Sequence, residues 1–146
     1  MSELSDKETL RYSRHLLLEE VGLEGQLALK SSTVAVVGAG GLGSPALLYL
    51  AAAGIGTLIL IDDDEVELSN LQRQVLYKIN HLGQSKVAAA GKVLASLNNQ
   101  INIVTHCQKL DESNAANMLK GADIVLDCSD NFSTRYSVNR YCIANK

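Results

Sequence analysis

The sequence predicts an α/β fold in which a doubly wound, mainly parallel, Rossmann-like sheet carries helices on both faces. Two observations support this prediction. Apolar runs rich in β-branched residues alternate with helical segments after about residue 32. Within these runs polar and apolar residues do not alternate, which is typical of strands buried on both sides of a parallel sheet. The 4 predicted strands are about half of a complete doubly wound sheet, so they correspond to the N-terminal half of such a fold.

The first 31 residues are predicted to be helical. Ser5 to Glu8 has the pattern of a capping box, which would open a helix that runs to about Val21 and ends at Gly22. A short helical stretch over 25–29 follows. We expect the long helix to pack its apolar face on the sheet and to leave its basic face in water. Arg11, Arg14, His15 and Leu18 share the basic face, whereas Leu10, Leu17 and Val21 lie on another.

The βα units are predicted within residues 32–146, and the whole chain, 1–146, is expected to form one domain. The predicted strands are 33–37, 57–61, 101–105 and 123–127, and the helices after them cover about 44–53, 85–97, 113–119 and 132–146. Pro45 and Gly54 delimit the first of these helices. Because the last helix runs to Lys146 without a cap, we expect the chain to be the front part of a longer protein.

The composition argues against several classes of function. Lys and Arg number 13 against 16 Asp and Glu, and the net charge of −3 argues against a nucleic-acid partner. No apolar run is long enough to cross a bilayer and no signal-peptide pattern follows Met1, so we expect a cytoplasmic protein with no membrane partner. Cys107, Cys128 and Cys142 form no C-x-x-C pair, so they predict neither a zinc site nor a disulfide framework.

A glycine-rich loop follows the first predicted strand. Gly38, Gly40 and Gly43 have the spacing G-x-G-x-x-G, with Gly41 between them. Glycine permits the tight turn and lets a phosphate approach the backbone, and the next helix directs its free N–H groups at that phosphate. Asp62 ends the second strand, where an acidic side chain accepts hydrogen bonds from ribose hydroxyls. The pattern predicts that the βα units bind a nucleotide, for which NAD is the usual ligand.

A polar cluster favours a different nucleotide. It comprises residues 62–74, which follow the second strand, and Lys86, which opens the next helix. Arg73 offers a planar fork for phosphate oxygens, and a cation at a helix start is unfavourable unless it meets an anion. Asp127 and Asp130 follow the fourth strand, and an acidic group beside a phosphate needs a cation such as Mg²⁺. Together these residues indicate triphosphate chemistry rather than hydride transfer, although each alone also fits a solvated loop or surface.

These motifs resemble those of the adenylyltransferases that activate ubiquitin-like proteins, most of all the bacterial members that act on sulfur carriers in molybdopterin and thiamin biosynthesis. The resemblance covers nearly the whole chain. It rests on Arg11-Tyr12-Ser13-Arg14-His15, the loop Gly38–Gly43, Asp62-x-Asp64, Ser69-Asn70-Leu71-Gln72-Arg73-Gln74, Lys86 and Leu126-Asp127-Cys128-Ser129-Asp130-Asn131. Members of the family bind ATP and Mg²⁺ and adenylate the C-terminal glycine carboxylate of a small ubiquitin-like carrier protein, with release of pyrophosphate.

The resemblance implies a role for each matching residue. Asp62 would hold the ribose and Asp130 the metal ion, and Arg14 would reach the ATP of the other subunit in a homodimer. Arg14, Arg73, Lys86 and Asp130 are therefore the expected catalytic residues. The expected nucleotide-binding residues are Gly38, Gly40, Gly41, Gly43, Asp62, Asp64, Ser69, Asn70, Arg73, Gln74, Lys86 and Asn131, of which Asn70, Arg73 and Lys86 would hold the phosphates.

Several alternatives stay open at the level of sequence. The glycine loop and Asp62 alone would also fit an NAD(P)-dependent oxidoreductase. A truncated module that binds nucleotide without turnover is a second alternative, and a family member that modifies a small molecule or tRNA is a third. The paired C-x-x-C zinc motif of many members would lie beyond residue 146, so zinc is expected only through downstream sequence. No cysteine of this chain occupies the position of the family's reactive cysteine.

Overall fold

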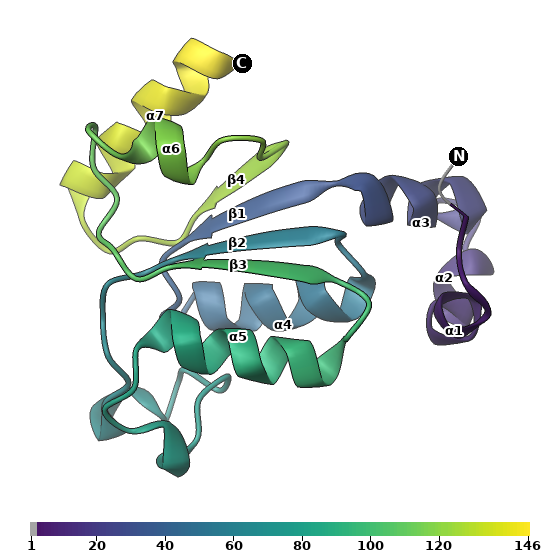
Figure 1. Cartoon of the computed structure of the whole chain (residues 1–146), viewed down its shortest axis with the longest axis horizontal. Coiled ribbons are helices and arrows are strands. Elements are labelled where there is room, and N and C mark those ends of the chain that lie inside the picture. The colour runs from purple at the N-terminus through teal and green to yellow at the C-terminus, as the bar shows by residue number, and fades with distance from the viewer. Residues whose placement is uncertain (1–2) are drawn as a thin grey trace.

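The structure is a computed structural model that describes residues 3–146, and it confirms the predicted parallel sheet (Figure 1). The strands are β1 (Thr33–Val37), β2 (Thr57–Ile61), β3 (Asn102–His106) and β4 (Ile124–Asp127). All pairings are parallel, in the order β3-β2-β1-β4. The chain therefore steps from β1 to β2 and β3 on one side and returns to β4 on the other. This reversal creates a crevice at the carboxyl ends of β1 and β4, where doubly wound sheets bind ligands.

Helices cover both faces of the sheet, as predicted. α4 (Gly43–Ala53) and α5 (Lys86–Leu97) lie on one face, and α6 (Ala115–Met118) and α7 (Phe132–Asn145) on the other (Figure 1). Alternate residues of the central strands supply the two cores. Val34, Val36, Leu58 and Leu60 pack with Leu47, Ala51 and Leu94, whereas Ala35, Val37, Ile59 and Ile61 pack with Met118, Leu119 and Val138.

The helix boundaries follow local capping signals. Gly54 ends α4 in the left-handed conformation, with φ of 87°, where a side chain would be strained. Ser85 accepts a hydrogen bond from the Ala88 amide at the start of α5, and Asn131 accepts one from the Thr134 amide at the start of α7. The 3₁₀ turns η1 (Leu68–Asn70) and η2 (Ile79–His81) lie in the long connection between β2 and α5. Predicted and observed boundaries of β3 and β4 differ by one residue.

The predicted long N-terminal helix is wrong. The capping box at Ser5 is present, but the predicted helix is divided into α1 (Asp6–Arg11) and α2 (Ser13–Leu16), and α3 (Gly22–Ser31) follows at the position of the predicted second stretch. The division occurs at Tyr12, which is 4% exposed and whose hydroxyl accepts a hydrogen bond of 2.8 Å from Asn98 Nδ2. Its ring fills the space beside Gly54. A Cβ added to Gly54 would lie 2.4 Å from Cζ of the Tyr12 ring. This long-range packing overrides the local helical pattern.

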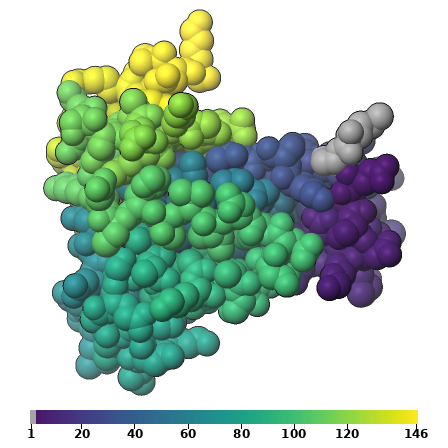
Figure 2. Space-filling view, viewed as in Figure 1, coloured from purple at the N-terminus to yellow at the C-terminus, as the bar shows by residue number. Residues whose placement is uncertain are grey.

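The predicted apolar face of this segment is also wrong. Leu10 and Leu17 are 79% and 77% exposed, whereas Glu8 is buried and its carboxylate accepts a hydrogen bond of 2.9 Å from Lys30 Nζ. Gly22 does not close a helix but begins α3, which extends beyond the predicted stretch 25–29. Figure 2 shows the residues of α1 and α2, in purple, gathered at one end of the molecule. In the part of the chain that the structure describes, no helix has the length and apolar character that a membrane crossing needs.

Candidate functional site

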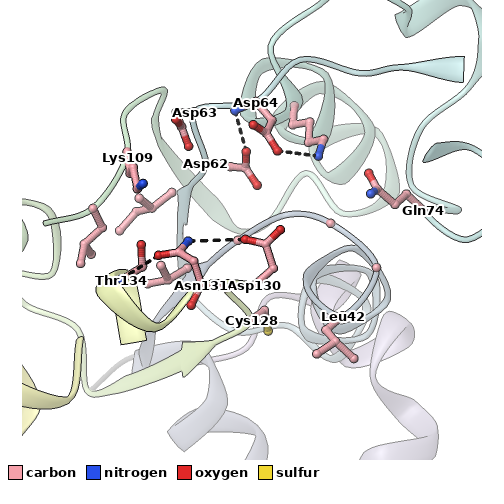
Figure 3. Close-up of a pocket in the computed structure, with 18 of the residues that line it drawn as sticks. Leu42, Asp62, Asp63, Asp64, Gln74, Lys109, Cys128, Asp130, Asn131 and Thr134 are labelled. Carbon is pink, nitrogen blue, oxygen red and sulfur yellow. Dashed lines mark hydrogen bonds and ion pairs between the residues drawn. The ribbon is translucent and has the colours of Figure 1, made fainter. Parts of the chain in front are cut away.

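A cleft of about 770 Å³ lies at the carboxyl ends of the strands. Its walls are the glycine loop after β1, Asp62–Asp64 after β2, Gln108–Leu110 after β3 and Cys128–Asn131 after β4 (Figure 3). The cleft thus occupies the topological switch point of the sheet. It brings together eleven of the residues expected to act: Gly38, Gly40, Gly41, Asp62, Asp64, Asn70, Arg73, Gln74, Lys86, Asp130 and Asn131.

Three expected residues do not line this cleft. Arg14 is exposed on α2, at the end of the sheet where the strands begin (Figure 1). Ser69 is exposed, and its backbone carbonyl accepts a hydrogen bond of 3.2 Å from Arg73 Nη1. Gly43 is buried at the start of α4, and a Cβ added there would lie 1.8 Å from the Gly38 carbonyl oxygen. Gly43 therefore acts through packing, because it lets the loop close against the helix.

The other loop glycines have distinct roles. Gly38 has φ of +93°, and a Cβ there would lie 2.6 Å from the Cys128 carbonyl oxygen, so only glycine fits between β1 and β4. A Cβ at Gly40 would lie 3.5 Å from Gln74 Nε2, and one at Gly41 would lie 3.8 Å from Arg73 Nε. The bare backbone at Gly40 and Gly41 therefore faces two donor-bearing side chains across the cleft.

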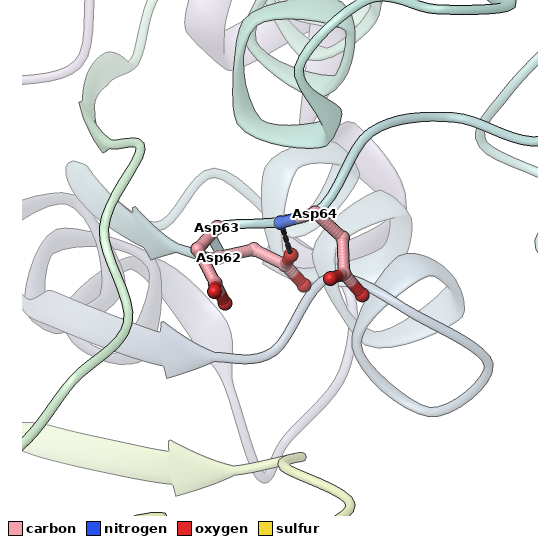
Figure 4. A group of neighbouring side chains, drawn as sticks. All are labelled: Asp62, Asp63 and Asp64. Atoms are coloured by element: carbon pink, nitrogen blue, oxygen red, sulfur yellow. Dashed lines mark hydrogen bonds between the residues drawn. The ribbon is translucent and has the colours of Figure 1, made fainter.

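Asp62 is held by the backbone on two sides. Its Oδ2 accepts a hydrogen bond of 2.7 Å from the Ala39 amide, and its Oδ1 accepts one of 2.8 Å from the Asp64 amide (Figure 4). Burial raises the pKa of Asp62, against the lowering effect of these two hydrogen bonds and of the Lys86 charge. A carboxylate has about four lone-pair positions, so the oriented side chain retains capacity for a ligand hydroxyl.

Lys86 is not a surface lysine. It is 5% exposed at the first position of α5, and its Nζ lies 3.1 Å from Asp64 Oδ2. A buried cation at a helix N-terminus is unfavourable unless it pairs with an anion. Asp64, whose side chain is 66% exposed, is that anion for Lys86. An ammonium has three donors, so Lys86 can bind a phosphate oxygen while it keeps Asp64.

We do not assign a metal site to the acidic cluster Asp62–Asp64 after β2. Asp62, Asp63 and Asp64 can each place one oxygen within 4.8 Å of the others (Figure 4). However, Asp62 is bonded to two amides and Asp64 to Lys86. We therefore interpret the Asp62 and Asp64 carboxylates as partners of the protein's own donors.

Gln74 has an amide oxygen available to a ligand. The side chain lines the cleft and is 3% exposed, and its Oε1 has no hydrogen-bond partner within residues 3–146. Leaving a buried acceptor unpaired costs about 1–3 kcal/mol, and a ligand donor would remove that cost. Nucleosides carry such donors as hydroxyl and amino groups, so this buried acceptor fits a nucleotide.

Asp130 and Asn131 lie where β4 meets α7 (Figure 3). The Asn131 oxygen accepts a hydrogen bond of 2.9 Å from the Thr134 amide and caps α7, while its Nδ2 lies 3.4 Å from Asp130 Oδ1. Asp130 is exposed at the cleft. Its carboxylate oxygens are the ligand type that Mg²⁺ prefers, so this residue fits the metal that the sequence predicts.

Two cations of the cleft were not predicted from the sequence. Lys109 follows β3, and Arg135 lies in the first turn of α7, where its Nη2 donates a hydrogen bond of 3.0 Å to the Ser129 carbonyl. Gln108, Ser129 and Thr134 also line the cleft. Their positions in the sequence could have indicated this, because residues just past the carboxyl ends of parallel strands lie at one edge of the sheet.

The environment of Cys128 does not activate its thiol. Cys128 is half-buried at the cleft, and burial raises the pKa of its thiol, with the charge of Asp127 adding to the shift. A nucleophilic cysteine needs a lowered pKa, so the environment of Cys128 opposes that role. Cys107 is exposed, and Cys142 is half-buried in α7.

The fold and the cleft define a Rossmann-like α/β domain with its binding crevice at the switch point of the sheet. A family model described as the ThiF family matches residues 12–146. The chain therefore belongs to the ThiF family.

The chain is similar to several curated proteins. It is 49% identical over its whole length to adenylyltransferase and sulfurtransferase MOCS3 of Aedes aegypti, of which it covers 33%. It is 49% identical over 132 residues, 90% of the chain, to the SAMP-activating enzyme E1 of Haloferax volcanii, of which it covers 49%. Over 94% of the chain it is 49% identical to the probable adenylyltransferase/sulfurtransferase MoeZ of Mycobacterium tuberculosis, of which it covers 35%. The chain thus spans about a third to a half of these relatives.

Solved structures share the fold. The E. coli tRNA N6-threonylcarbamoyladenosine dehydratase TcdA in complex with ATP matches with a TM-score of 0.92 and 27% identity over 99% of this chain and 59% of that one. E. coli MccB with MccA-N7isoASN matches with a TM-score of 0.81 and 30% identity over 92% of this chain and 41% of that one. One of these two structural relatives therefore contains bound ATP.

Proposed function

We propose that the protein uses ATP and Mg²⁺ to adenylate the C-terminal glycine carboxylate of a ubiquitin-like sulfur-carrier protein, with release of pyrophosphate. One observation carries this proposal. Asn70, Arg73 and Lys86 line the same switch-point cleft as the glycine loop, which is an arrangement for a polyphosphate rather than for a nicotinamide. In this proposal the chain, 1–146, is the nucleotide-binding portion, with helices in 1–31 and βα units in 32–146.

The carrier is supported as the acceptor by the pattern of similarity. Relatives at 49% identity are named as adenylyltransferases or as an enzyme that activates SAMP. The matching tRNA dehydratase has only 27% identity to this chain. The higher identity favours a carrier protein over tRNA, in agreement with the net charge of −3.

The proposed reaction is a displacement at the α-phosphorus of ATP. A carboxylate oxygen of the carrier bonds to this phosphorus, the bond to the bridging oxygen breaks, and pyrophosphate leaves with that oxygen. The chain supplies position and charge. Arg73 and Lys86 would stabilise the negative charge that develops on the phosphate oxygens, while Asp62 would hold the ribose in place.

Asp130 is the residue that would hold Mg²⁺ in this proposal. A bound Mg²⁺ supplies positive charge to the phosphate oxygens. Asp130 itself is placed by the turn between β4 and α7, next to the N-cap Asn131. The carboxylate would therefore meet the ligand from the β4 side of the cleft, whereas Lys86 lines the cleft from the start of α5.

We further propose that the protein acts as a homodimer in which Arg14 reaches the cleft of the other copy. Arg14 is exposed on α2, and α2 lies at the end of the sheet opposite the cleft (Figure 1). The surrounding segment also exposes Leu10, Leu17 and Leu18. In this proposal these leucines belong to one apolar patch that the other copy covers.

Mixing two inactive variants tests the role of Arg14. We expect Arg14→Ala and Arg73→Ala each to lose most activity, and their mixture to recover up to about a quarter of it, because some mixed dimers hold one intact site. Activity is measured after the variants have exchanged subunits. Mixed dimers that form without any recovery would contradict action across the dimer.

Carrier-dependent exchange of pyrophosphate into ATP tests the reaction itself. We expect the full-length protein to exchange labelled pyrophosphate only with Mg²⁺ and a carrier that ends in glycine. A carrier that lacks the terminal glycine is the matched control. Exchange that is indifferent to the carrier, or reduction of NAD by the same protein, would contradict the proposal.

A further inference from the structure

A buried tyrosine joins two walls of the cleft. The Tyr77 hydroxyl donates a hydrogen bond of 2.6 Å to the carbonyl oxygen of Ala39, the second residue of the glycine loop. Tyr77 and Ala39 are 4% and 1% exposed. They are 38 positions apart in the sequence, so the bond is a tertiary contact between two segments.

Tyr77 is continuous with the segment that carries the phosphate-binding candidates. Its amide donates to the Gln74 carbonyl at 3.1 Å, and the amides of Gln74 and Arg73 donate to the Asn70 carbonyl at 2.9 and 3.2 Å. These consecutive turns fix the backbone from residue 70 to residue 77. The hydroxyl of Tyr77 therefore fixes the whole 70–77 segment relative to the glycine loop.

Ala39 is also hydrogen-bonded to Asp62. Its carbonyl accepts from Tyr77, and its amide donates to Asp62 Oδ2 at 2.7 Å. Asp62 in turn accepts from the Asp64 amide, and Asp64 accepts from Lys86 Nζ at 3.1 Å. One chain of hydrogen bonds thus joins the 70–77 segment, the glycine loop, the end of β2 and the start of α5.

We propose that Tyr77 is a positioning residue, whose hydroxyl holds the glycine loop in register with the 70–77 segment and so preforms the cleft for its ligand. It acts through Ala39. The inference rests on the proposed function only for the identity of the ligand as ATP. The entropy of ordering the glycine loop and the 70–77 segment is lost when the protein folds. A ligand that binds the preformed cleft does not lose it again, and therefore binds more tightly.

The tyrosine hydroxyl suits this role at all physiological pH values. Burial raises the pKa of Tyr77, and the negative charges of Asp62 and Asp64 raise it further. The hydroxyl therefore stays protonated and keeps its donor. Without this donor the buried Ala39 carbonyl loses its partner, which favours movement of the loop towards water.

Tyr77→Phe tests the proposal because it removes the hydroxyl and keeps the ring. We expect amide hydrogen exchange at Ala39 in the ligand-free, full-length protein to accelerate roughly tenfold, with exchange in β1 and β2 unchanged. We also expect the dissociation constant and KM for MgATP to rise roughly three- to tenfold, with kcat within about twofold of wild type. A merely structural role would lower the active fraction and leave KM unchanged.

Tyr12→Phe is the matched control. It also removes a buried tyrosine hydroxyl, one that bonds to Asn98 at the end of the sheet where the strands begin. We expect it to leave exchange at Ala39 and the affinity for MgATP as in wild type. Wild-type exchange at Ala39 in Tyr77→Phe, or equal acceleration throughout β1 and β2, would overturn the positioning role.

The two proposals fail in different ways. Faster exchange at Ala39 in a protein that binds no MgATP even as wild type would support the positioning role of Tyr77 and count against the proposed function. An unchanged KM in a protein that adenylates its carrier would overturn the role of Tyr77 and leave the proposed function in place.

Discussion

Asp130→Asn is expected to lower Mg²⁺-dependent pyrophosphate exchange by at least about a hundredfold, because it removes the carboxylate that would hold the metal ion beside the phosphates. Asparagine keeps the size of the side chain, and its amide oxygen is a weaker ligand. The thermal midpoint should change little, since Asp130 is exposed at the cleft. The measurement is the exchange rate as a function of Mg²⁺ concentration.

Glu112→Gln is the control for this prediction. Glu112 pairs with Arg140 on the surface and is 61% exposed, so the substitution makes the same change of charge outside the cleft. Its exchange rate should match wild type. Wild-type exchange by Asp130→Asn at every Mg²⁺ concentration would refute the metal role.

Gly43→Ala is expected to destabilise the protein by about 3 kcal/mol or more and to abolish binding of MgATP. The added Cβ would lie 1.8 Å from the Gly38 carbonyl oxygen, which is backbone and cannot rotate away. The glycine loop would have to shift away from α4, and with it the bare backbone at Gly40 and Gly41. Urea unfolding and titration with MgATP measure the two effects.

Gly91→Ala is the matched control in a second helix. A Cβ at Gly91 meets Thr105 Cγ2 at 3.4 Å, which is an ordinary contact, and alanine favours the helix by roughly 1 kcal/mol. We expect this variant to be as stable as wild type or more stable, with unchanged nucleotide binding. Equal behaviour of Gly43→Ala and Gly91→Ala would contradict the packing role of Gly43.

The sheet was predictable because its strands carry an unambiguous local signal. Thr33–Val37 and Thr57–Ile61 are apolar and rich in branched residues, and the structure places them at the centre of the sheet. The N-terminal segment was not predictable from periodicity. Its break at Tyr12 depends on Gly54 and Asn98, which are distant in sequence, and a local pattern does not record such partners.

Much of the cleft was predictable for a geometric reason. Parallel strands end at one edge, so Asp62 and Asp130 were expected to lie near the glycine loop, and both line the cleft. Lys109 and Arg135 belong to the same edge but to no recognisable motif. Tyr77 was missed because its role depends on a hydrogen bond to Ala39, and a tyrosine in a long loop gives no sign of its partner.

Calorimetric titration with MgATP and, separately, with NAD tests the central claim that this cleft is built for a nucleoside triphosphate. We expect saturable binding of MgATP with one site per chain, no saturable heat with NAD, and loss of the MgATP signal in Arg73→Ala. Saturable binding of NAD without binding of MgATP would contradict the claim and make the glycine loop a dinucleotide site instead.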